Sequence, residues 1–373
     1  MKLERYKGWE SELKELIITL AEIPSPTGKE QKKAEYIGDW LQRQGASGVW
    51  RDTAGNVCWL WGTGQEHLTV FMAHMDTVFA ESVKLEVQER DGRLYCPGIG
   101  DNTANLACML MAAKAAIRSG KEPKSPVLFA ATTGEEGLGN LVGSRTLFES
   151  FGEHVEQVVC FDLYREAITC QAVGSVRYEI SVHTKGGHSY NDFGNTSAIA
   201  AAAELIHRLY QVDVPKKAKT TCNVGTIHGG TTVNSIASEA VFTYEFRSVD
   251  RDCLEEMENN FRRIAGEMQL SGVELAVREI GRRPCNGAVS EERLEVLTSA
   301  HQEILQRHTE TKVRRIPYST DANIPLSMGI PAVNIGTISG GALHTEEEYI
   351  ELDSIRAGLS IALESLLLYG ELE

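Results

Sequence analysis

The chain has 373 residues, and its 37 lysines and arginines against 52 aspartates and glutamates give a formal net charge of −15. Hydrophobic residues make up 42% of the sequence, which is enough to bury a core and excludes a disordered chain. The length indicates two domains, or one large domain with an insertion. The acidic balance argues against a general nucleic-acid or membrane binder, because phosphates attract positively charged surfaces.

The N-terminal segment is predicted to be a helix and not a secretion signal. Apolar residues recur at helical spacing from Trp9 to Leu20, and Pro24 ends the pattern. The longest uncharged stretch, 322–345, contains two prolines and several glycines, so it is predicted as strand and loop and not as a membrane helix. Eight widely scattered cysteines without a C-x-x-C pair are typical of reduced thiols, and we expect a cytoplasmic protein.

Apolar strands alternate with helical patterns at both ends of the chain. Short apolar runs predict buried strands at 57–61, 68–73, 127–131, 158–161 and 332–335. Helical patterns cover 103–118, 291–308 and 352–369. This alternation predicts an α/β fold with a mostly parallel sheet.

The middle of the chain follows another pattern. Residues 175–183 alternate apolar and polar side chains, as in a half-exposed antiparallel strand. A helix at 197–211, strands at 223–228 and 240–246, a helix at 252–268 and a strand at 273–279 follow. This β-α-β-β-α-β order predicts an inserted α+β domain. We therefore expect a catalytic domain of residues 1–174 and 284–373, interrupted by a smaller domain of residues 175–283.

Residues that can bind a metal ion follow the predicted strands of the first domain. They are His74 and Asp76 after the second strand, Asp101 before the helix at 103, Glu135 and Glu136 after the third strand, Asp162 after the fourth, and His344 after the last. The carboxyl ends of strands in open α/β sheets form the ligand crevice, so we expect these side chains to converge. Any one of these short motifs alone is a weak signal.

The negative charge of the converging side chains points to a metal site. Asp101, Glu136 and Asp162 would bring three negative charges into one partly buried site, which requires compensation. Two divalent cations with a bridging hydroxide would supply it, and a mixed histidine and carboxylate set suits zinc, or cobalt or manganese. Glu135 adjoins a ligand and can serve as a base. Asp76 can hold the His74 imidazole in its ligating tautomer.

The ordered motifs resemble those of the M20 metallopeptidases over essentially the whole chain. They are His74-Met75-Asp76-Thr77, Gly100-Asp101-Asn102, Gly134-Glu135-Glu136-Gly137, Asp162 and the late His344. This family of co-catalytic dizinc hydrolases includes peptidase T, dipeptidases, carboxypeptidases, acetylornithine deacetylase and succinyl-diaminopimelate desuccinylase.

The resemblance implies a role for each motif. His74, Asp101 and Asp162 would hold one metal ion, while Asp101, Glu136 and His344 would hold the other, with Asp101 bridging. Glu135 would be the general base and acid, and Asp76 would orient His74. The peptide bond between Asp101 and Asn102 would be cis.

The inserted domain resembles the lid of the family, which commonly also forms a homodimer interface. Its Gly186-Gly187-His188-Ser189 motif implies that His188 reaches the active site of the partner subunit and stabilises the oxyanion, although a surface-turn histidine is the alternative. Asn234 and Arg247 match substrate-binding positions; Arg247 would clamp a substrate carboxylate or, alternatively, form a salt bridge on the sheet. Gly340 and Gly341 would line the substrate pocket through close backbone approach.

Two positions bear on the substrate. The run Asp101-Asn102-Thr103-Ala104-Asn105 departs from the Asp-Asp-Lys or Thr-Asp-Met-Lys of many members. Asp162 resembles the aminopeptidases and dipeptidases, whereas carboxypeptidases and deacylases more often have glutamate there. We therefore expect metal-dependent amide hydrolysis of di- or tripeptides, through a metal-bridging hydroxide with Glu135 as base. An N-acyl amino acid deacylase or desuccinylase, and a binding protein that has lost its metal, are the alternatives.

Overall fold

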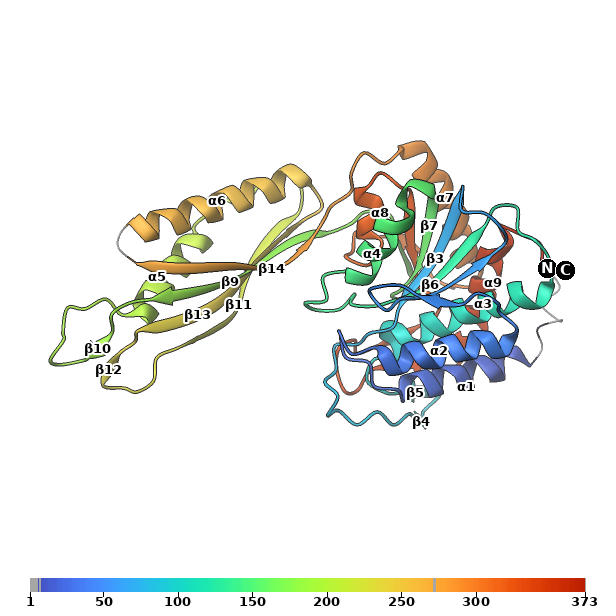
Figure 1. The fold of residues 1–373 in the computed structure, drawn as a ribbon, viewed down its shortest axis with the longest axis horizontal. Coiled ribbons are helices and arrows are strands. Elements are labelled where there is room, and N and C mark those ends of the chain that lie inside the picture. The colour runs from blue at the N-terminus through green and yellow to red at the C-terminus, as the bar shows by residue number, and fades with distance from the viewer. Residues whose placement is uncertain (1–5, 7, 271–272, 373) are drawn as a thin grey trace. The chain divides into compact units, whose positions relative to one another are not determined.

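The computed structural model describes residues 6, 8–270 and 273–372, which form two compact units (Figure 1). The first unit comprises Met1–Ala172 and Gly287–Glu373, and the second comprises Val173–Asn286. The chain leaves the first unit once and returns to it once, so the second unit is an insertion.

The first unit is built on an eight-stranded sheet in the order β1-β2-β6-β3-β7-β16-β8-β15. The strands are β1 (Trp50–Arg51), β2 (Val57–Trp61), β3 (Leu68–His74), β6 (Val127–Thr132), β7 (Val155–Phe161), β8 (Ala167–Thr169), β15 (Arg314–Arg315) and β16 (Ala332–Ile335). The four central strands, β6, β3, β7 and β16, are parallel to one another, while β2 joins β6 and β8 joins β16 in antiparallel pairs. The predicted α/β class with a mostly parallel sheet is confirmed.

Helices cover both faces of this sheet. One face carries α1 (Trp9–Ala21), α2 (Gln31–Gln44), α3 (Asn105–Ser119) and α9 (Ser354–Leu367), the other carries α4 (Val142–Phe151) and α8 (Asn323–Ser327), and α7 (Glu291–Arg307) packs on β16. The short turn η3 (Gly152–His154) follows α4. The structure thus places a helix, α8, inside the stretch 322–345 that was predicted as strand and loop. Pro325 is tolerated there because the first turn of a helix needs few backbone donors.

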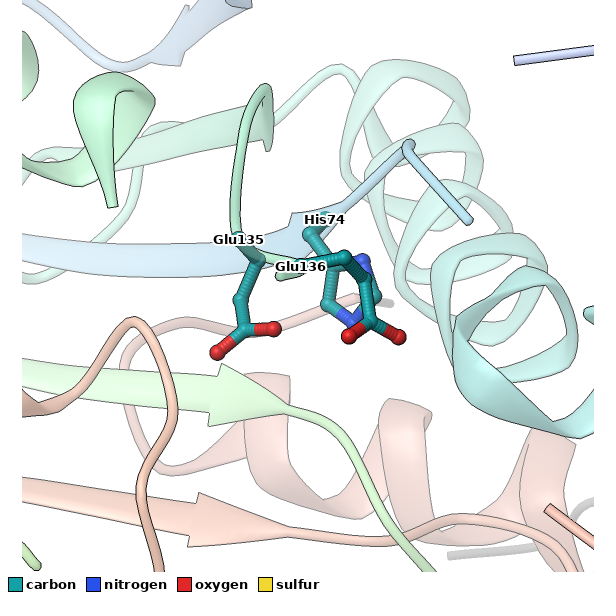
Figure 2. Close-up of side chains that lie close together, drawn as sticks. All are labelled: His74, Glu135 and Glu136. Carbon is teal, nitrogen blue, oxygen red and sulfur yellow. The ribbon is translucent and has the colours of Figure 1, made fainter. Parts of the chain in front are cut away.

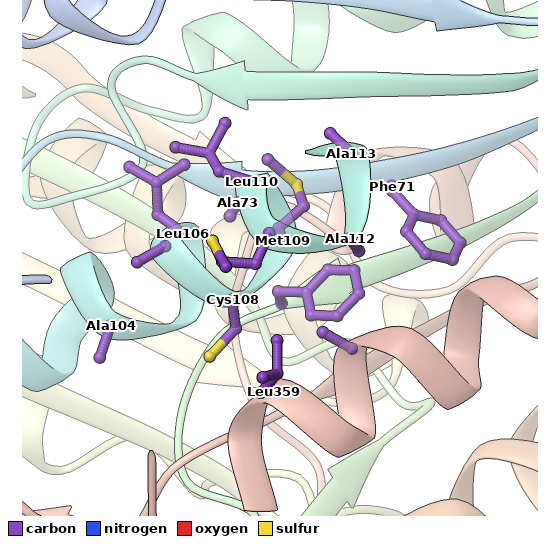
Figure 3. Packing of buried hydrophobic residues seen from close by; sticks show 14 of the residues in the cluster. Phe71, Ala73, Ala104, Leu106, Cys108, Met109, Leu110, Ala112, Ala113 and Leu359 are labelled. Atoms are coloured by element: carbon purple, nitrogen blue, oxygen red, sulfur yellow. The ribbon is translucent and has the colours of Figure 1, made fainter. Parts of the chain in front are cut away.

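The strand β3 shows why both faces need helices. All seven of its residues are buried; Phe71 and Ala73 belong to one apolar cluster, and Val70 and Met72 to another. Figure 3 shows Phe71 and Ala73 beside α3 residues from Leu106 to Ala113. Each fully buried side chain of the size of Val70, Phe71 or Met72 contributes about 1.5–3 kcal/mol to the free energy of unfolding. Burial on both faces therefore fixes β3, and with it the position of His74 at its end.

A small second sheet of the first unit has the order β17-β18-β5-β4. Its strands are β4 (Gln88–Arg90), β5 (Arg93–Tyr95), β17 (Gly340–Gly341) and β18 (Tyr349–Glu351). Sequence patterns did not predict this sheet, because its strands of two or three residues are too short to show alternation.

The second unit contains a four-stranded antiparallel sheet in the order β11-β13-β9-β14. Its elements along the chain are β9 (Gly174–His183), α5 (Ala198–Tyr210), β11 (Thr220–Gly229), β13 (Glu239–Ser248), α6 (Arg251–Leu270) and β14 (Glu274–Arg283), with β10 (Gly187–His188) and β12 (Ser235–Ile236) as a separate ladder. Both helices bury one face of the sheet around aromatic residues such as Tyr178, Phe246 and Phe261. The predicted β-α-β-β-α-β order is confirmed.

Within the described part of the chain, the helices fall short of the length and hydrophobicity needed to cross a bilayer. Cys58, Cys96, Cys108 and Cys160 are buried free thiols in the first unit.

Candidate metal centre

The carboxyl ends of the parallel strands bring the predicted site residues to one edge of the sheet. His74 is the last residue of β3 and pairs in register with Thr132, the last residue of β6. Glu135 and Glu136 follow in the loop after β6, and Asp162 directly follows β7. The register of β7 with β3 and β16 aligns these strand ends, so the convergence follows from strand pairing alone.

Two groups of candidate metal ligands share Asp101. His74, Asp101 and Asp162 form one group, and Asp101, Glu136 and His344 form the other; within each group the ligand atoms all lie within 4.8 Å of one another. The Nε2 atom of His74 lies 3.1 Å from Asp101 Oδ1, and His344 Nε2 lies 3.2 Å from Asp101 Oδ2. Asp101 therefore presents one oxygen to each histidine, which is the arrangement of a bridging ligand.

A third group of candidate ligands consists of His74, Glu135 and Glu136 and contains no aspartate. The side chains of Glu135 and Glu136 and the imidazole of His74 extend into the same space (Figure 2). Both carboxylates reach this space although Glu135 and Glu136 are adjacent in sequence. Glu135 thus lies beside the two groups that share Asp101 but belongs to neither of them.

The donor set fits divalent transition-metal ions. Imidazole nitrogen and carboxylate oxygen are the ligand types of zinc, cobalt and manganese sites. The Nδ1 atom of His74 faces the backbone oxygen of Asp76 at 3.1 Å, so Nδ1 carries the proton and Nε2 is the nitrogen that could bind a metal ion. His344 Nε2 also lies 3.1 Å from Glu136 Oε1. Each histidine thus points a ligating nitrogen at carboxylates.

The pKa values of the cluster show strong electrostatic coupling. Burial and repulsion by Asp101 raise the pKa of Asp162 well above its usual range. Burial alone would raise the pKa of Asp101 too, but contacts with His344 and His74 lower it. Contacts with Asp101 and Glu136 raise the pKa of His344 to about 10. The crowded carboxylates therefore favour positive charge at this place, as a cation site requires.

The irregular turn η2 (Ile99–Ala104) carries Asp101 into the site. Its Asp101–Asn102 peptide bond is cis, as the family resemblance implied. The Asn102 side chain donates a hydrogen bond to the backbone oxygen of Phe161 at 2.7 Å, and Asn105 donates to that of Leu163 at 2.9 Å. The run that departs from the usual family motif thus ties this turn to the end of β7.

Asp76 acts mainly on the loop that carries Glu135 and Glu136. Its carboxylate accepts hydrogen bonds from the backbone N–H of Glu135 at 3.0 Å and of Glu136 at 2.9 Å, and from the Thr27 hydroxyl at 2.9 Å. Its Oδ1 lies 3.4 Å from His74 Nδ1, a longer contact than the one His74 makes with the Asp76 backbone oxygen. The orienting role expected of Asp76 therefore extends to the loop of Glu135 and Glu136.

Sequence reasoning missed two buried ionisable residues behind this loop. Glu30 accepts a hydrogen bond from the backbone N–H of Gly134 at 3.1 Å. Lys33, one turn further along α2, is 1% exposed, and burial lowers its pKa to about 8 against the attraction of Asp76 and Glu30. Nothing in the sequence distinguishes Lys33 from the exposed lysine beside it, because both lie in the polar first turn of a helix.

Sequence reasoning also missed Glu348, four residues after His344. Its side chain is completely buried, and burial raises its pKa to about 7. The residue closes the run Glu346-Glu347-Glu348, which reads as a solvated acidic surface.

Gly340 and Gly341 form β17, and aromatic side chains fill the space above them. A Cβ atom on Gly340 would lie 2.9 Å from Tyr164 Cε1, and one on Gly341 would lie 2.8 Å from the Tyr349 hydroxyl oxygen. Close packing against Tyr164 and Tyr349 therefore explains both glycines, and their part in a substrate pocket stays a prediction.

His188 lies in the second unit, on a turn that fixes its imidazole. The Nδ1 atom accepts hydrogen bonds from the backbone N–H of Tyr190 at 3.2 Å and of Asn191 at 3.4 Å, and Asp192 accepts one from the His188 N–H at 2.7 Å. Gly187 has a φ of 141°, and a Cβ there would lie 2.7 Å from Asp192 Cβ. Because Nδ1 is an acceptor, the proton sits on Nε2, so the exposed imidazole is a hydrogen-bond donor.

Asn234 lies beside His188, whereas Arg247 does not. His188 pairs with Ser235 across the β10–β12 ladder, and the backbone oxygen of Asn234 accepts a hydrogen bond from Ser189 at 3.0 Å. Arg247 lies near the far end of β13, where its guanidinium forms a two-point contact with Glu245 at 3.0 and 3.1 Å. The sheet salt bridge given as the alternative for Arg247 is therefore present.

Comparison with known proteins places the chain among hydrolases. The family model for peptidase family M20/M25/M40 matches residues 70–367. An acetylornithine deacetylase of Myxococcus xanthus is 29% identical over 201 residues, which span 50% of this chain and 51% of that protein.

Two solved structures share the fold over nearly the whole chain. A tripeptidase of Staphylococcus aureus is 23% identical, with a TM-score of 0.76 over 96% of this chain and 98% of that one. A dinuclear metal-binding peptidase of the M20 family from Bacillus subtilis is 17% identical, with a TM-score of 0.68 over 97% and 99%. At these identities the likeness concerns the fold.

Proposed function

The chain belongs to peptidase family M20/M25/M40, a family of hydrolytic enzymes, and from this premise we propose that it cleaves an amide bond in short peptides with the help of two divalent metal ions. One observation carries the proposal: two ligand groups share Asp101, and Glu135 lies beside both without belonging to either. Zinc is the proposed metal, with cobalt and manganese as alternatives, because the ligands combine imidazole and carboxylate.

The proposed ligands are His74, Asp101 and Asp162 for one ion and Asp101, Glu136 and His344 for the other. Bound there, the ions would lower the pKa of the attacking water and polarise the scissile carbonyl.

Glu135 is the proposed general base and acid. Its carboxylate would accept the proton of the attacking water and then deliver it to the leaving amine nitrogen, so that one side chain serves both proton transfers. The loop bonds of Glu135 and Glu136 to Asp76 keep base and ligand in a fixed relation. Such pre-positioning lowers the entropy cost of the reaction.

His188 is proposed to stabilise the oxyanion from a second copy of the chain. Arg247 is eight residues beyond Glu239, the first residue of β13. Because a strand rises about 3.3 Å per residue, about 26 Å of strand separates Glu239 from Arg247. The His188 ladder adjoins the Glu239 end of β13 (Figure 1). A tripeptide spans at most about 10 Å. One substrate therefore cannot contact both His188 and Arg247 of the same chain. In a homodimer, one subunit would supply Arg247 and the other would supply His188.

The edge of the second unit supports such a homodimer. Strand β11 is the outer strand of its sheet and is exposed over most of its length. Ile227 on β11 is 49% exposed, and Ile199 and Tyr210 on the adjacent α5 are 43% and 49% exposed. An exposed strand edge with apolar neighbours favours pairing with an identical edge.

Arg247 and Asn234 are the proposed substrate-binding residues of the inserted unit. The Arg247 side chain is 38% exposed, and its guanidinium already holds the carboxylate of Glu245 in a two-point contact. The same geometry suits the carboxylate of a peptide C-terminus. Gly340 and Gly341 would contribute to the pocket through the backbone of β17.

An N-acyl amino acid is the second candidate substrate, because it carries the same carboxylate and amide. The similarity to an acetylornithine deacetylase over half of each chain keeps it in consideration. A binding protein that has lost its metal is disfavoured by the complete ligand set. We place the protein in the cytoplasm, since buried free thiols such as Cys58 and Cys108 suit a reducing compartment.

A substrate panel tests the proposed function. Di- and tripeptides are assayed beside N-acetyl and N-succinyl amino acids, with zinc, cobalt and manganese added separately to chelator-treated protein. We expect metal-dependent release of amino acids from the peptides. Faster cleavage of the acyl compounds would favour the deacylase activity over the proposed peptidase activity. A lack of turnover with all three metals would reject both activities.

A further inference from the structure

Glu348 binds backbone groups of two separate loops. Its Oε1 accepts hydrogen bonds from the N–H groups of Gly100 and Asp101, both at 2.8 Å. Its Oε2 accepts from Gly98 at 3.2 Å and from His344 at 3.3 Å. One buried carboxylate thus joins the turn of Asp101 to the loop of His344, which are more than 240 residues apart in sequence.

The His344 loop needs such an anchor. Ala342 and His344 have φ angles of 58° and 61°, in the left-handed region that is unfavourable for a residue other than glycine. The backbone of Glu348 also accepts a hydrogen bond from Cys96 N–H at 3.0 Å, which ties the end of this loop to the core. The hydrogen bond that Glu348 accepts from the His344 N–H therefore helps to hold an unfavourable backbone conformation.

The two ligand groups depend on Glu348 to different degrees. His74 is the last residue of a buried strand and Asp162 directly follows another, so regular sheet pairing positions both. Asp101 and His344 lie on irregular segments, and each donates its backbone N–H to Glu348. Glu136, the remaining member of the second group, is held in the same way by Asp76.

We propose that Glu348 is a positioning residue that sets the affinity of the protein for the metal ion held by Asp101, Glu136 and His344. The proposal rests on the dinuclear site proposed above. It assigns Glu348 no contact with substrate or metal: the carboxylate acts through the backbone of two ligands. Residues that orient ligands typically change metal affinity about 10- to 100-fold.

Calorimetric titration of zinc into chelator-stripped protein tests this role without an activity assay. Glu348→Gln keeps the shape of the side chain but turns an amide NH₂ toward two of the four N–H donors, so half of the bonds are lost. Glu347→Gln is the matched control, because Glu347 is the preceding residue and its carboxylate pairs with Arg90 at 2.6 Å on the surface.

We expect the wild type and Glu347→Gln to bind two ions with the same affinities. Glu348→Gln should bind the weaker of its two ions about 10- to 100-fold less tightly than the wild type does. The affinity for the other ion should fall less, because that ion shares only Asp101 with the segments that Glu348 holds. The proposal would be overturned if Glu348→Gln bound both ions with wild-type affinity, or if its affinities for the two ions fell by the same factor. A wild type that binds fewer than two ions would instead reject the dinuclear site itself.

A second variant covers the case in which stripped Glu348→Gln does not fold, as judged by circular dichroism. A Cβ atom on Gly100 would lie 3.1 Å from Glu348 Oε1 and 3.0 Å from the Tyr164 hydroxyl oxygen. Gly100→Ala therefore crowds the same carboxylate and shifts it from its hydrogen-bond donors. We expect the same selective loss of one ion, and wild-type binding by Gly100→Ala would overturn the proposal.

Discussion

The carboxylate of Asp76 accepts a hydrogen bond from the backbone N–H of Glu136 at 2.9 Å, and its other oxygen accepts one from Glu135 at 3.0 Å. Two consecutive amides of one loop therefore converge on one buried side chain. Burial alone would raise the pKa of Asp76, but hydrogen bonds with His74 and with these amides lower it, so the acceptor is ionised at neutral pH. The proposed base and a proposed metal ligand are consequently held by a single negative charge.

Replacing Asp76 should impair both functions together. In Asp76→Asn an amide NH₂ faces one of the two N–H donors, so we expect kcat to fall and the zinc dissociation constant to rise, each about 10- to 100-fold. Steady-state kinetics and zinc titration measure the two effects. Asp39→Asn, at an exposed position of α2, serves as control. A drop in kcat with unchanged zinc affinity would contradict the joint role.

Glu135 and Glu136 should separate catalysis from metal binding. Glu135→Gln removes the proposed base and should lower kcat about 100- to 10,000-fold while two ions remain bound. Glu136→Gln removes a ligand and should lose one ion. Metal content by mass spectrometry and turnover are measured on the same samples. Substantial activity in Glu135→Gln would disprove the assignment of the base.

Much of this centre could be read from the sequence, because hydrophobic runs mark the strands and polar residues mark where they end. His74, Glu135, Glu136 and Asp162 all come directly or a few residues after such runs, and parallel pairing places them together. His344 was also expected in the cluster because it follows the last strand, although an irregular loop separates the two, and the family resemblance implied its role as a ligand.

The supporting residues could not be read in this way. Lys33 and Glu348 occur in polar surroundings in the sequence, and only packing against distant segments buries them. The partner of Arg247 was equally ambiguous, because a guanidinium two residues from Glu245 on a strand pairs within the sheet as readily as with a substrate.

His301 should make the stability of the protein depend on pH. It lies buried on α7, its Nδ1 is 2.9 Å from the backbone oxygen of Leu297, and its Nε2 has no partner among the described residues. Burial lowers its pKa from 6.5 to about 4. The unfolded chain then binds more protons between these values, so the free energy of unfolding falls as the pH drops from 6.5 to 4, by about 3 kcal/mol in total.

Comparison of the wild type with His301→Gln isolates this contribution, because glutamine keeps a donor but does not titrate. Denaturant unfolding of chelator-treated protein between pH 4 and 8 gives the difference in free energy at each pH. We expect that difference to be constant above pH 6.5 and to shift in favour of the variant below it. A difference independent of pH would show that His301 does not titrate in this range.

Arg247 should act on the substrate carboxylate. We expect Arg247→Gln to raise KM for peptides with a free C-terminus about 10- to 100-fold, since hydrogen bonds to charged groups contribute about 1.5–3 kcal/mol. KM for C-terminally amidated peptides should not change. Arg278→Gln is the control, because Arg278 on β14 is 68% exposed and forms a comparable salt bridge with Glu179 on β9. Equal effects on both peptide types would favour a structural role.

The distance between His188 and Arg247 along the inserted unit predicts complementation between two inactive proteins. Glu135→Gln has an intact His188 but no base, while His188→Ala has an intact base but no proposed oxyanion donor. If His188 acts in the partner subunit, a mixed dimer contains one complete site, formed by the catalytic unit of the His188→Ala chain and the His188 of the other chain. Random exchange makes half of the dimers mixed, so activity should recover to about a quarter of the wild-type value.

The experiment mixes the two variants under conditions that allow subunit exchange and follows peptide hydrolysis with time. Each variant alone, carried through the same procedure, gives the baseline. Recovery should depend on exchange and disappear when the subunits of each variant are cross-linked beforehand. Activity that stays at the sum of the two baselines would place His188 in its own active site, and the separation along β13 would then require Arg247 to have no contact with the substrate.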